Sequence, residues 1–332
     1  ITAILILMAL FLFIQPFSGK KPVTIGAIVS LSGYGEQMVD VSNGMKLALE
    51  TINKHGGINE KPLEVILKDS RSDPGAAVEL FIQMEKKDRP LLYTSTLSSI
   101  SLAVSEEAEK AEAPLIALVS TNPNITKGKN WVYSFFPSAE DEIPPVISIL
   151  RSRSVTSIGL LYHNDPYGDS IYRELDSYHD DYNYELKAIQ YEMSRTNFSD
   201  IVESLQETEA VYAVGYRSHL ENIFTELRRQ KYTGIIIGPS TASTPSFSIN
   251  PIMDGIYVAA PIIYKKNYAF SEKIKSRYEQ TYEKPFNHYA ATGYEFINMV
   301  ASIVKDTGFE RTELKEKFDK GFIYPGIFGD SI

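Results

Sequence analysis

Small hydroxyl side chains follow two neighbouring strand-like segments of the chain, at the points where the segments end. Ser98 opens a helical pattern after the first, and Thr121 follows the second, beside Ser120 and the backbone carbonyl of Val119. A helix start offers free N–H groups and a positive dipole end, so Ser98 can receive an anionic group. The structural alternative is that Ser98 only caps its helix and Thr121 only makes a turn.

Patterns typical of catalysis or metal binding do not emerge. The chain has no GxSxG elbow and no HExxH motif, and its five histidines are scattered. The sets His163/Asp165 and His179/Asp181 supply two ligands each, fewer than a closed coordination shell needs. We therefore predict no catalytic residue and no metal site.

A nucleotide-dependent enzyme on a Rossmann-like fold is the alternative from another class. Gly33 and Gly35 lie between a strand pattern and a helix pattern, but the third glycine of GxGxxG would fall at Met38. Asp69 is also much further along than the roughly 20 residues expected for a ribose contact. We interpret this stretch as a glycine-permitted turn at a ligand cleft and predict no cofactor.

Length and charge set the broad class. With 332 residues and 43% hydrophobic content the chain can bury the cores of two domains, and it has no cysteine for disulfides or thiol chemistry. The net charge of −9 gives no support to a nucleic-acid role, which usually needs a Lys/Arg excess.

The N-terminal segment 1–19 is predicted to be a signal peptide or membrane anchor. Residues 1–14 are apolar except for Thr2 and precede Lys20 and Lys21. Fourteen helical residues reach about 21 Å, short of the roughly 30 Å hydrocarbon core. A signal-peptide hydrophobic region fits this length better, and a retained tether stays open.

Two series of alternating strand and helix patterns follow. Segment 22–74 reads as strand, helix and strand, with Val41, Met45, Ala48 and Ile52 on one helix face and Asp73 capping the next helix. A similar alternation restarts at Val155. Such alternation predicts parallel, doubly wound sheets, and the join near 137–142 and the return near Pro261 are expected to be short crossover strands. The C-terminal segment 321–332 is expected to end within an apolar strand.

The opening stretch resembles the type I periplasmic solute-binding proteins of the leucine/isoleucine/valine-binding family. The residues that carry the resemblance are Ile25-Gly26, Leu31-Ser32-Gly33-Tyr34-Gly35, Asn43-Gly44 through Ala48, Ile52-Asn53, Gly56-Gly57-Ile58, and Asp69 with Ser72-Asp73-Pro74. Similarity continues at lower density to about Gly329. The resemblance implies an α/β fold of two doubly wound, Rossmann-like lobes joined by crossover hinge strands, with lobe 1 at 22–138 plus 262–332 and lobe 2 at 139–261.

The resemblance also implies a ligand site between the lobes. In the family, the positions that match Ser98 and Ser99 and those that match Val119, Ser120 and Thr121 hold the ligand's α-carboxylate and α-ammonium. The tyrosines at matching aromatic positions, with a large apolar face and one polar tip suited to closing over a small ligand, are Tyr34, Tyr167, Tyr216 and Tyr289.

One position departs from the family pattern. Where branched-chain amino-acid binders present a Glu to the ligand's ammonium, this chain has Ser240. A buried ammonium without a carboxylate is poorly compensated. We therefore expect a carboxylate, amide or aromatic acid without a free α-ammonium, unless an acid from segment 140–142 takes the missing place.

The sequence thus predicts a non-enzymatic solute-binding receptor in the periplasm or another extracytoplasmic space. The expected partners are a small-molecule ligand, an amino acid or related carboxylate or amide, and the membrane subunits of an ABC transporter, with no nucleic acid and with the protein as a monomer. A ligand-sensing input domain of a membrane signalling receptor is the alternative within the binding class.

Overall fold

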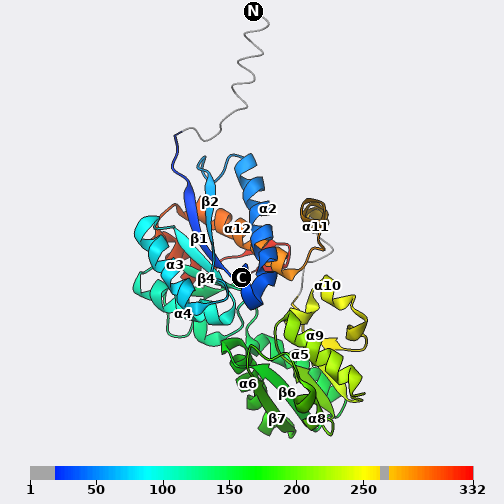
Figure 1. The fold of residues 1–332 in the computed structure, drawn as a ribbon. Coiled ribbons are helices and arrows are strands. Elements are labelled where there is room, and N and C mark those ends of the chain that lie inside the picture. Colours follow the sequence, from blue (N-terminus) through cyan, green and yellow to red (C-terminus); the bar gives the residue numbers. More distant parts are fainter. Residues whose placement is uncertain (1–18, 262–268, 332) are drawn as a thin grey trace, which may run out of the picture.

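The computed structural model describes residues 19–261 and 269–331, which form two α/β lobes (Figure 1). The first sheet has the order β2-β1-β3-β4-β5 and the second the order β10-β9-β8-β6-β7. Every neighbouring pair in both sheets is parallel. Because parallel neighbours need a crossover connection, helices separate most of the strands. The predicted class of two doubly wound lobes is confirmed.

The first sheet and its helices come from the N-terminal part of the chain. Its strands are β1 (Val23–Val29), β2 (Leu63–Asp69), β3 (Leu92–Thr96), β4 (Leu115–Leu118) and β5 (Val132–Ser134). Its helices are η1 (Gly33–Met38), α2 (Val39–Lys54), α3 (Pro74–Lys87), α4 (Ser98–Lys110) and η2 (Pro123–Ile125).

The second sheet and its helices occupy the middle of the chain. Its strands are β6 (Ser157–His163), β7 (Glu185–Tyr191), β8 (Ala210–Ala213), β9 (Ile235–Gly238) and β10 (Tyr257–Val258). The helices are α5 (Ala139–Ser152), α6 (Pro166–Ser177), α7 (His179–Tyr182), α8 (Ser199–Ser204), α9 (Arg217–Arg229), η3 (Ser240–Ser243), α10 (Pro245–Ser248) and η4 (Pro251–Met253).

Local sequence signals explain where the helices begin. The α2 face predicted to be apolar is buried at Val41, Met45 and Ala48. The Asp73 carboxylate accepts a hydrogen bond from the Ala76 N–H at 2.6 Å, with Pro74 as the first helical residue of α3. The Asp73 cap and the Pro74 start of α3 follow the known preferences for an acidic N-cap and for proline in the first turn of a helix.

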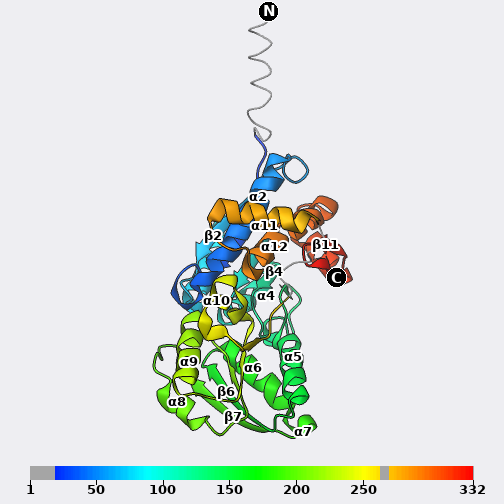
Figure 2. The same cartoon turned by 90° about the vertical axis from the view of Figure 1, so that its right-hand side faces the viewer.

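The C-terminal helices return to the first lobe, as Figure 2 shows for α11 (Ala269–Tyr282) and α12 (His288–Thr307). Helices α2 and α12 cross at two glycines. A Cβ added at Gly44 would lie 2.0 Å from the Ala290 carbonyl oxygen, and one at Gly293 would lie 2.0 Å from that of Val41. Only glycine permits this approach, so the crossing fixes the start of α12 beside the cleft.

The chain then forms α13 (Arg311–Lys320) and a short antiparallel hairpin of β11 (Tyr324–Gly326) and β12 (Gly329–Ser331). The segment ends in a strand as expected, but β12 consists of Gly329, Asp330 and Ser331 and is not apolar. The Ile327 N–H, in the turn of the hairpin, donates to the Glu295 carboxylate at 2.9 Å. Ile327 itself is buried, so the hairpin is held against α12.

The join between the two sheets also differs from expectation. Residues 135–138 cross between the lobes, whereas residues 139–142 form the first turn of α5 and not a crossover strand. Ser138 caps this helix, because the Asp141 carboxylate accepts from its N–H at 2.8 Å and its hydroxyl at 2.9 Å. Pro144 and Pro145 lie inside α5, where each lacks a backbone donor, and this hid the helix from sequence patterns.

Two predictions extend beyond the described residues. Almost all of the predicted leader falls on residues 1–18, and the predicted return near Pro261 borders residues 262–268; both ranges lie outside the described part. The lobe boundaries at 138/139 and 261/262 therefore stay predictions. Within residues 19–261 and 269–331, no helix is both long and apolar enough to cross a bilayer.

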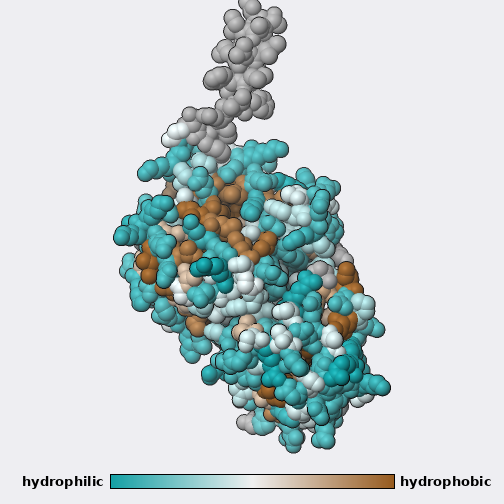
Figure 3. Space-filling model, viewed as in Figure 1, coloured by the Kyte–Doolittle hydropathy of each residue, from teal (hydrophilic) through white to brown (hydrophobic). Residues whose placement is uncertain are grey.

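In Figure 3 the larger hydrophobic area lies on the first lobe, and smaller ones are visible on the mainly hydrophilic second lobe. The edge strand β2 contributes partly exposed apolar side chains at Val65, Ile66 and Leu67.

Candidate ligand-binding cleft

The two lobes meet around a small cavity of about 20 Å³ at the carboxyl ends of β3 and β4. Open α/β sheets place ligands at these ends of their strands. The predicted site residues that line the cavity are Ser98, Val119, Thr121, Tyr167, Tyr216 and Ser240. The lining residues that sequence patterns did not indicate are Gln37, Met38, Leu97, Phe136 and Thr241.

Ser98 and Thr121 form the wall contributed by the first lobe. The Thr121 N–H donates to Ser98 Oγ at 3.1 Å, which leaves the Ser98 hydroxyl hydrogen available to a further acceptor. Thr121 Oγ1 is buried and has no hydrogen-bond partner among the described residues. Two adjacent hydroxyl donors can therefore receive one carboxylate or another polar group.

Strained backbone holds this wall in place. Leu97 has φ 72° and Val119 has φ 49°, at the ends of β3 and β4. Positive φ is costly for side chains of these types, and above all for β-branched valine. Such outliers cluster at ligand sites because the surrounding fold imposes them. Sequence patterns did not indicate these two backbone conformations, since neither leucine nor valine favours a positive φ.

Asp165 positions the two tyrosines of the second lobe. Its Oδ1 accepts from the Gly168 N–H at 2.9 Å, which starts α6 and presents Tyr167 from the first turn. Its Oδ2 accepts from the Tyr216 hydroxyl at 3.1 Å. The ring of His163 stacks on Tyr216 at a centroid distance of 4.8 Å, and its Nδ1 lies 2.7 Å from Asp165.

The Tyr167 hydroxyl points into the region between the lobes. It is buried close to the Ser240 side chain, and it has no hydrogen-bond acceptor among the described residues. Burial raises the pKa of Tyr167 well above its usual value, as it does the pKa of Tyr216. Tyr167 is therefore a neutral donor at physiological pH, and it lacks an acceptor in this arrangement.

Several contacts join the lobes directly. The rings of Tyr34 and Tyr216 meet across the cleft, and the Tyr34 hydroxyl lies 3.1 Å from Ser99 Oγ. The Asn122 side chain donates to the Pro166 carbonyl at 2.6 Å. Side chains of the two lobes are therefore in direct contact beside the cavity.

The remaining predicted residues lie around the cavity and do not line it. Ser99 contacts the Tyr34 hydroxyl, as described above. Ser120 Oγ lies 2.8 Å from Ser101 Oγ and donates to the Leu118 carbonyl at 3.0 Å, so its hydroxyl is occupied within the first lobe. The Tyr289 hydroxyl accepts from Gln37 Nε2 at 3.4 Å, and burial raises its pKa.

Ser240 is the first residue of η3, at the position where the family pattern has a Glu. Its hydroxyl donates to Glu142 Oε2 at 3.3 Å. Glu140 is exposed, whereas Glu142 is buried against Tyr212 and Ser240 of the second lobe. Within the acidic segment 140–142, Glu142 is therefore the residue that contacts Ser240.

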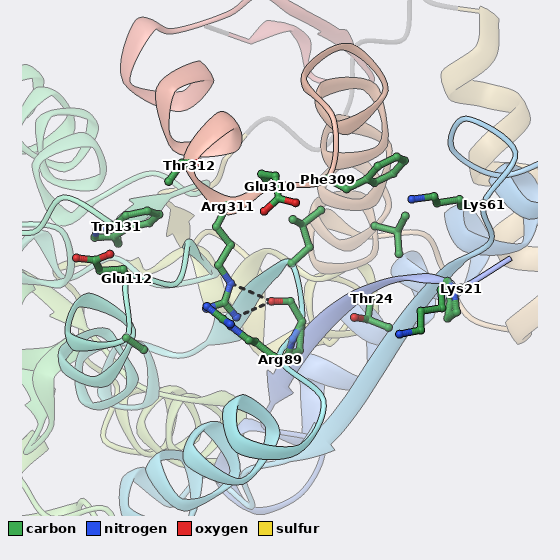
Figure 4. A pocket seen from close by; sticks show the side chains of 15 residues that line it. Lys21, Thr24, Lys61, Arg89, Glu112, Trp131, Phe309, Glu310, Arg311 and Thr312 are labelled. Carbon is green, nitrogen blue, oxygen red and sulfur yellow. Dashed lines mark hydrogen bonds between the residues drawn. The ribbon is translucent and has the colours of Figure 1, made fainter.

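A larger cavity of about 540 Å³ lies at the amino ends of the first sheet (Figure 4). Lys21, Lys61 and Arg89 contribute positive charge to it, and Arg311 donates to the Pro90 carbonyl and binds Glu85 at 2.7 and 2.9 Å. All of its lining residues belong to the first sheet and the helices around it. A ligand there would not close the lobes. No group of three or more His, Cys, Asp or Glu side chains suited to a metal ion is found in the described residues.

Known proteins of similar fold are named for different ligands. The leucine-binding protein LivK of Thermotoga maritima is 19% identical, with a TM-score of 0.83 over 93% of this chain and 90% of that one. A fatty acid ABC transporter substrate-binding protein from Thermomonospora curvata is 16% identical, with a TM-score of 0.84 over 93% and 84%. At such identities the likeness shows the fold alone.

A curated relative is the substrate-binding protein BasB of a chemotactic signal transduction system in Halobacterium salinarum. It is 30% identical over 115 residues, which cover 33% of this chain and 28% of that protein. The family model described as periplasmic binding protein matches residues 22–332. The chain therefore belongs to the periplasmic binding protein family, whose members are extracytoplasmic substrate-binding proteins.

Proposed function

We propose that this protein is the substrate-binding receptor of an ABC transporter and closes by hinge motion around a small amino acid or a related carboxylate or amide. The supporting observation is a pair of buried hydroxyls that have no hydrogen-bond acceptor among the described residues, Thr121 from one lobe and Tyr167 from the other. A buried donor without an acceptor costs about 1–3 kcal/mol. A polar ligand between the lobes removes this cost only in the closed form, so its binding favours closure.

The size of the cavity supports hinge motion. A space of about 20 Å³ admits about one or two water molecules and no amino acid. A ligand must therefore enter when the lobes are apart and shift neighbouring side chains as they close. The same proposal holds that the protein is a monomer and that its protein partners are the membrane subunits of an ABC transporter.

A panel of amino acids and small aliphatic and aromatic carboxylates tests this function on the purified protein. A true ligand raises the unfolding temperature with concentration, as mass action requires, and lowers the radius of gyration in small-angle scattering. A panel that stabilises the protein without any change in lobe orientation would contradict hinge closure.

Ligand sensing is the second candidate, and the partial similarity to BasB favours it. Stimulation of the ATPase of a reconstituted transporter by the liganded protein supports transport, and association with a membrane signalling protein supports sensing. If the protein is instead a nucleotide-dependent enzyme, nucleotides should raise its unfolding temperature or be turned over by it.

A further inference from the structure

Glu142 is a buried carboxylate in contact with Ser240, the residue that stands where the family pattern has a Glu. It lies in the first turn of α5 and is 7% exposed. Its Oε1 accepts from the Tyr212 hydroxyl at 2.8 Å and from the Ser240 N–H at 3.3 Å, and Oε2 accepts from the Ser240 hydroxyl at 3.3 Å. Glu142 thus replaces, from another helix, a carboxylate expected from the loop after β9.

No cation compensates this carboxylate within residues 19–261 and 269–331. Its partners there are the neutral donors of Tyr212 and Ser240. Burial raises the pKa of Glu142 to about 6, so the group is mainly ionised at neutral pH. An isolated buried charge is strongly unfavourable unless a counter-charge arrives.

Glu142 borders a cavity next to the one that Ser98 and Thr121 line, and the two cavities share wall residues. Phe136 and Ser240 line the small cavity beside Ser98 and Thr121, and they also line a cavity of about 230 Å³ that Glu142 borders. Tyr167 lines the small cavity together with Ser240, and the Ser240 hydroxyl donates to Glu142 Oε2 at 3.3 Å. The two cavities thus offer hydroxyl donors in one and a carboxylate acceptor in the other, with Phe136 and Ser240 lining both.

We propose that Glu142 receives the ammonium group of a zwitterionic ligand whose carboxylate is held by Ser98 and Thr121. This inference rests on the proposed function and narrows its ligand class to small molecules that carry both charges, such as α-amino acids. From Ser240 alone we expect a ligand without a free α-ammonium, unless an acid from segment 140–142 takes the place of the missing Glu. In this proposal Glu142 is that acid. In this proposal Ser240 donates hydrogen bonds to the Glu142 carboxylate and does not itself pair with the ammonium of the ligand.

Matched ligand pairs that differ only in the ammonium test the proposal. The probes are leucine with 4-methylpentanoate and phenylalanine with 3-phenylpropanoate, measured by titration calorimetry. The wild-type protein is expected to bind an amino acid about 100-fold or more tightly than its deaminated partner. Glu142→Gln keeps an acceptor for Tyr212 and Ser240 and should reduce this preference to about tenfold or less. Glu140→Gln, the same charge change on an exposed residue of the same turn, should leave it unchanged.

A second variant separates charge recognition from folding. Ser240→Glu in the Glu142→Gln background returns a carboxylate to the same wall and should restore the preference for the amino acid. A merely structural role of Glu142 predicts no such rescue. Thermal unfolding without ligand checks that each variant is folded.

The outcomes distinguish the two proposals. If deaminated acids bind as tightly as amino acids and close the lobes, the role of Glu142 is wrong and the proposed function stands. Equal weakening of both members of a pair by Glu142→Gln also overturns the role. If no member of the panel binds, the proposed function fails together with it.

Discussion

The ring of Tyr34 in the first lobe lies 4.8 Å from the ring of Tyr216 in the second, measured between centroids, with the planes at 43°. Each ring is held on its own side by its hydroxyl, which contacts Ser99 in one lobe and Asp165 in the other. The pair therefore joins two independently anchored surfaces. Such a contact stabilises the closed arrangement and is lost when the lobes separate.

Replacing Tyr216 should favour the open form. Aromatic pairs contribute about 0.5–1.5 kcal/mol beyond their buried area, so Tyr216→Ala should weaken closure by at least this amount. We expect a larger radius of gyration than wild type at the same subsaturating ligand concentration. Tyr178→Ala is the control, because Tyr178 stacks on Tyr182 within the second lobe at 5.5 Å. Identical scattering of Tyr216→Ala and wild type would contradict the role of the ring pair.

Removing both hydroxyls of the first lobe should weaken binding without unfolding the protein. The double variant Ser98→Ala/Thr121→Ala is expected to lose roughly 2–4 kcal/mol of binding free energy if two bonds to a charged group are lost. Titration calorimetry with a ligand found in the panel measures the loss. Ser152→Ala/Thr225→Ala is the matched control, since these exposed hydroxyls donate only within their own helices. Unchanged affinity in a folded Ser98/Thr121 variant would show that the anchors lie elsewhere.

The Tyr167 hydroxyl separates the empty closed form from the liganded one. Without ligand, Tyr167→Phe removes a buried donor that lacks an acceptor, so the closed form should become more favourable by about 1–3 kcal/mol. The empty variant should therefore show a smaller radius of gyration than empty wild type. With ligand, the variant lacks one hydrogen bond and should bind no more tightly. A larger radius for the empty variant would contradict this account.

Local signals allowed much of the fold to be predicted. The spacing of Val41, Met45 and Ala48 specifies a helix face, and Asp73 and Asp165 both cap helices that begin with proline. These features depend on neighbours within a few residues. Physical preferences of single residues and short spacings are sufficient to specify them.

The centre of the site depends on distant contacts that local patterns do not contain. Glu142 and Ser240 are 98 residues apart in the chain, and only the packing of α5 against η3 brings them together. The positive φ of Val119 opposes the preference of its residue type. Resemblance indicated Ser98, Thr121 and Tyr167, yet it could not indicate an acid supplied from a different element.

Glu295 provides a prediction that is independent of the ligand. This residue of α12 is 2% exposed, and burial raises the pKa of its carboxyl to about 7 from the ordinary value of 4.5. Between these two values the folded state binds more protons than the unfolded state, so the contribution of Glu295 to stability falls as pH rises from about 4.5 to 7. The loss is on the order of 3 kcal/mol above pH 7.

Glu295→Gln cannot ionise and still offers an amide oxygen to the Ile327 N–H. The unfolding temperature of the variant minus that of wild type should therefore rise between pH 5 and pH 7.5, with the variant more stable at the upper end. Taking the difference at each pH cancels the titration of groups shared by both proteins. Glu207→Gln, on an exposed residue, should show no such pH-dependent gain. A difference for Glu295→Gln that stays constant from pH 5 to 7.5 would mean that the Glu295 carboxyl ionises as readily in the folded protein as in the unfolded chain.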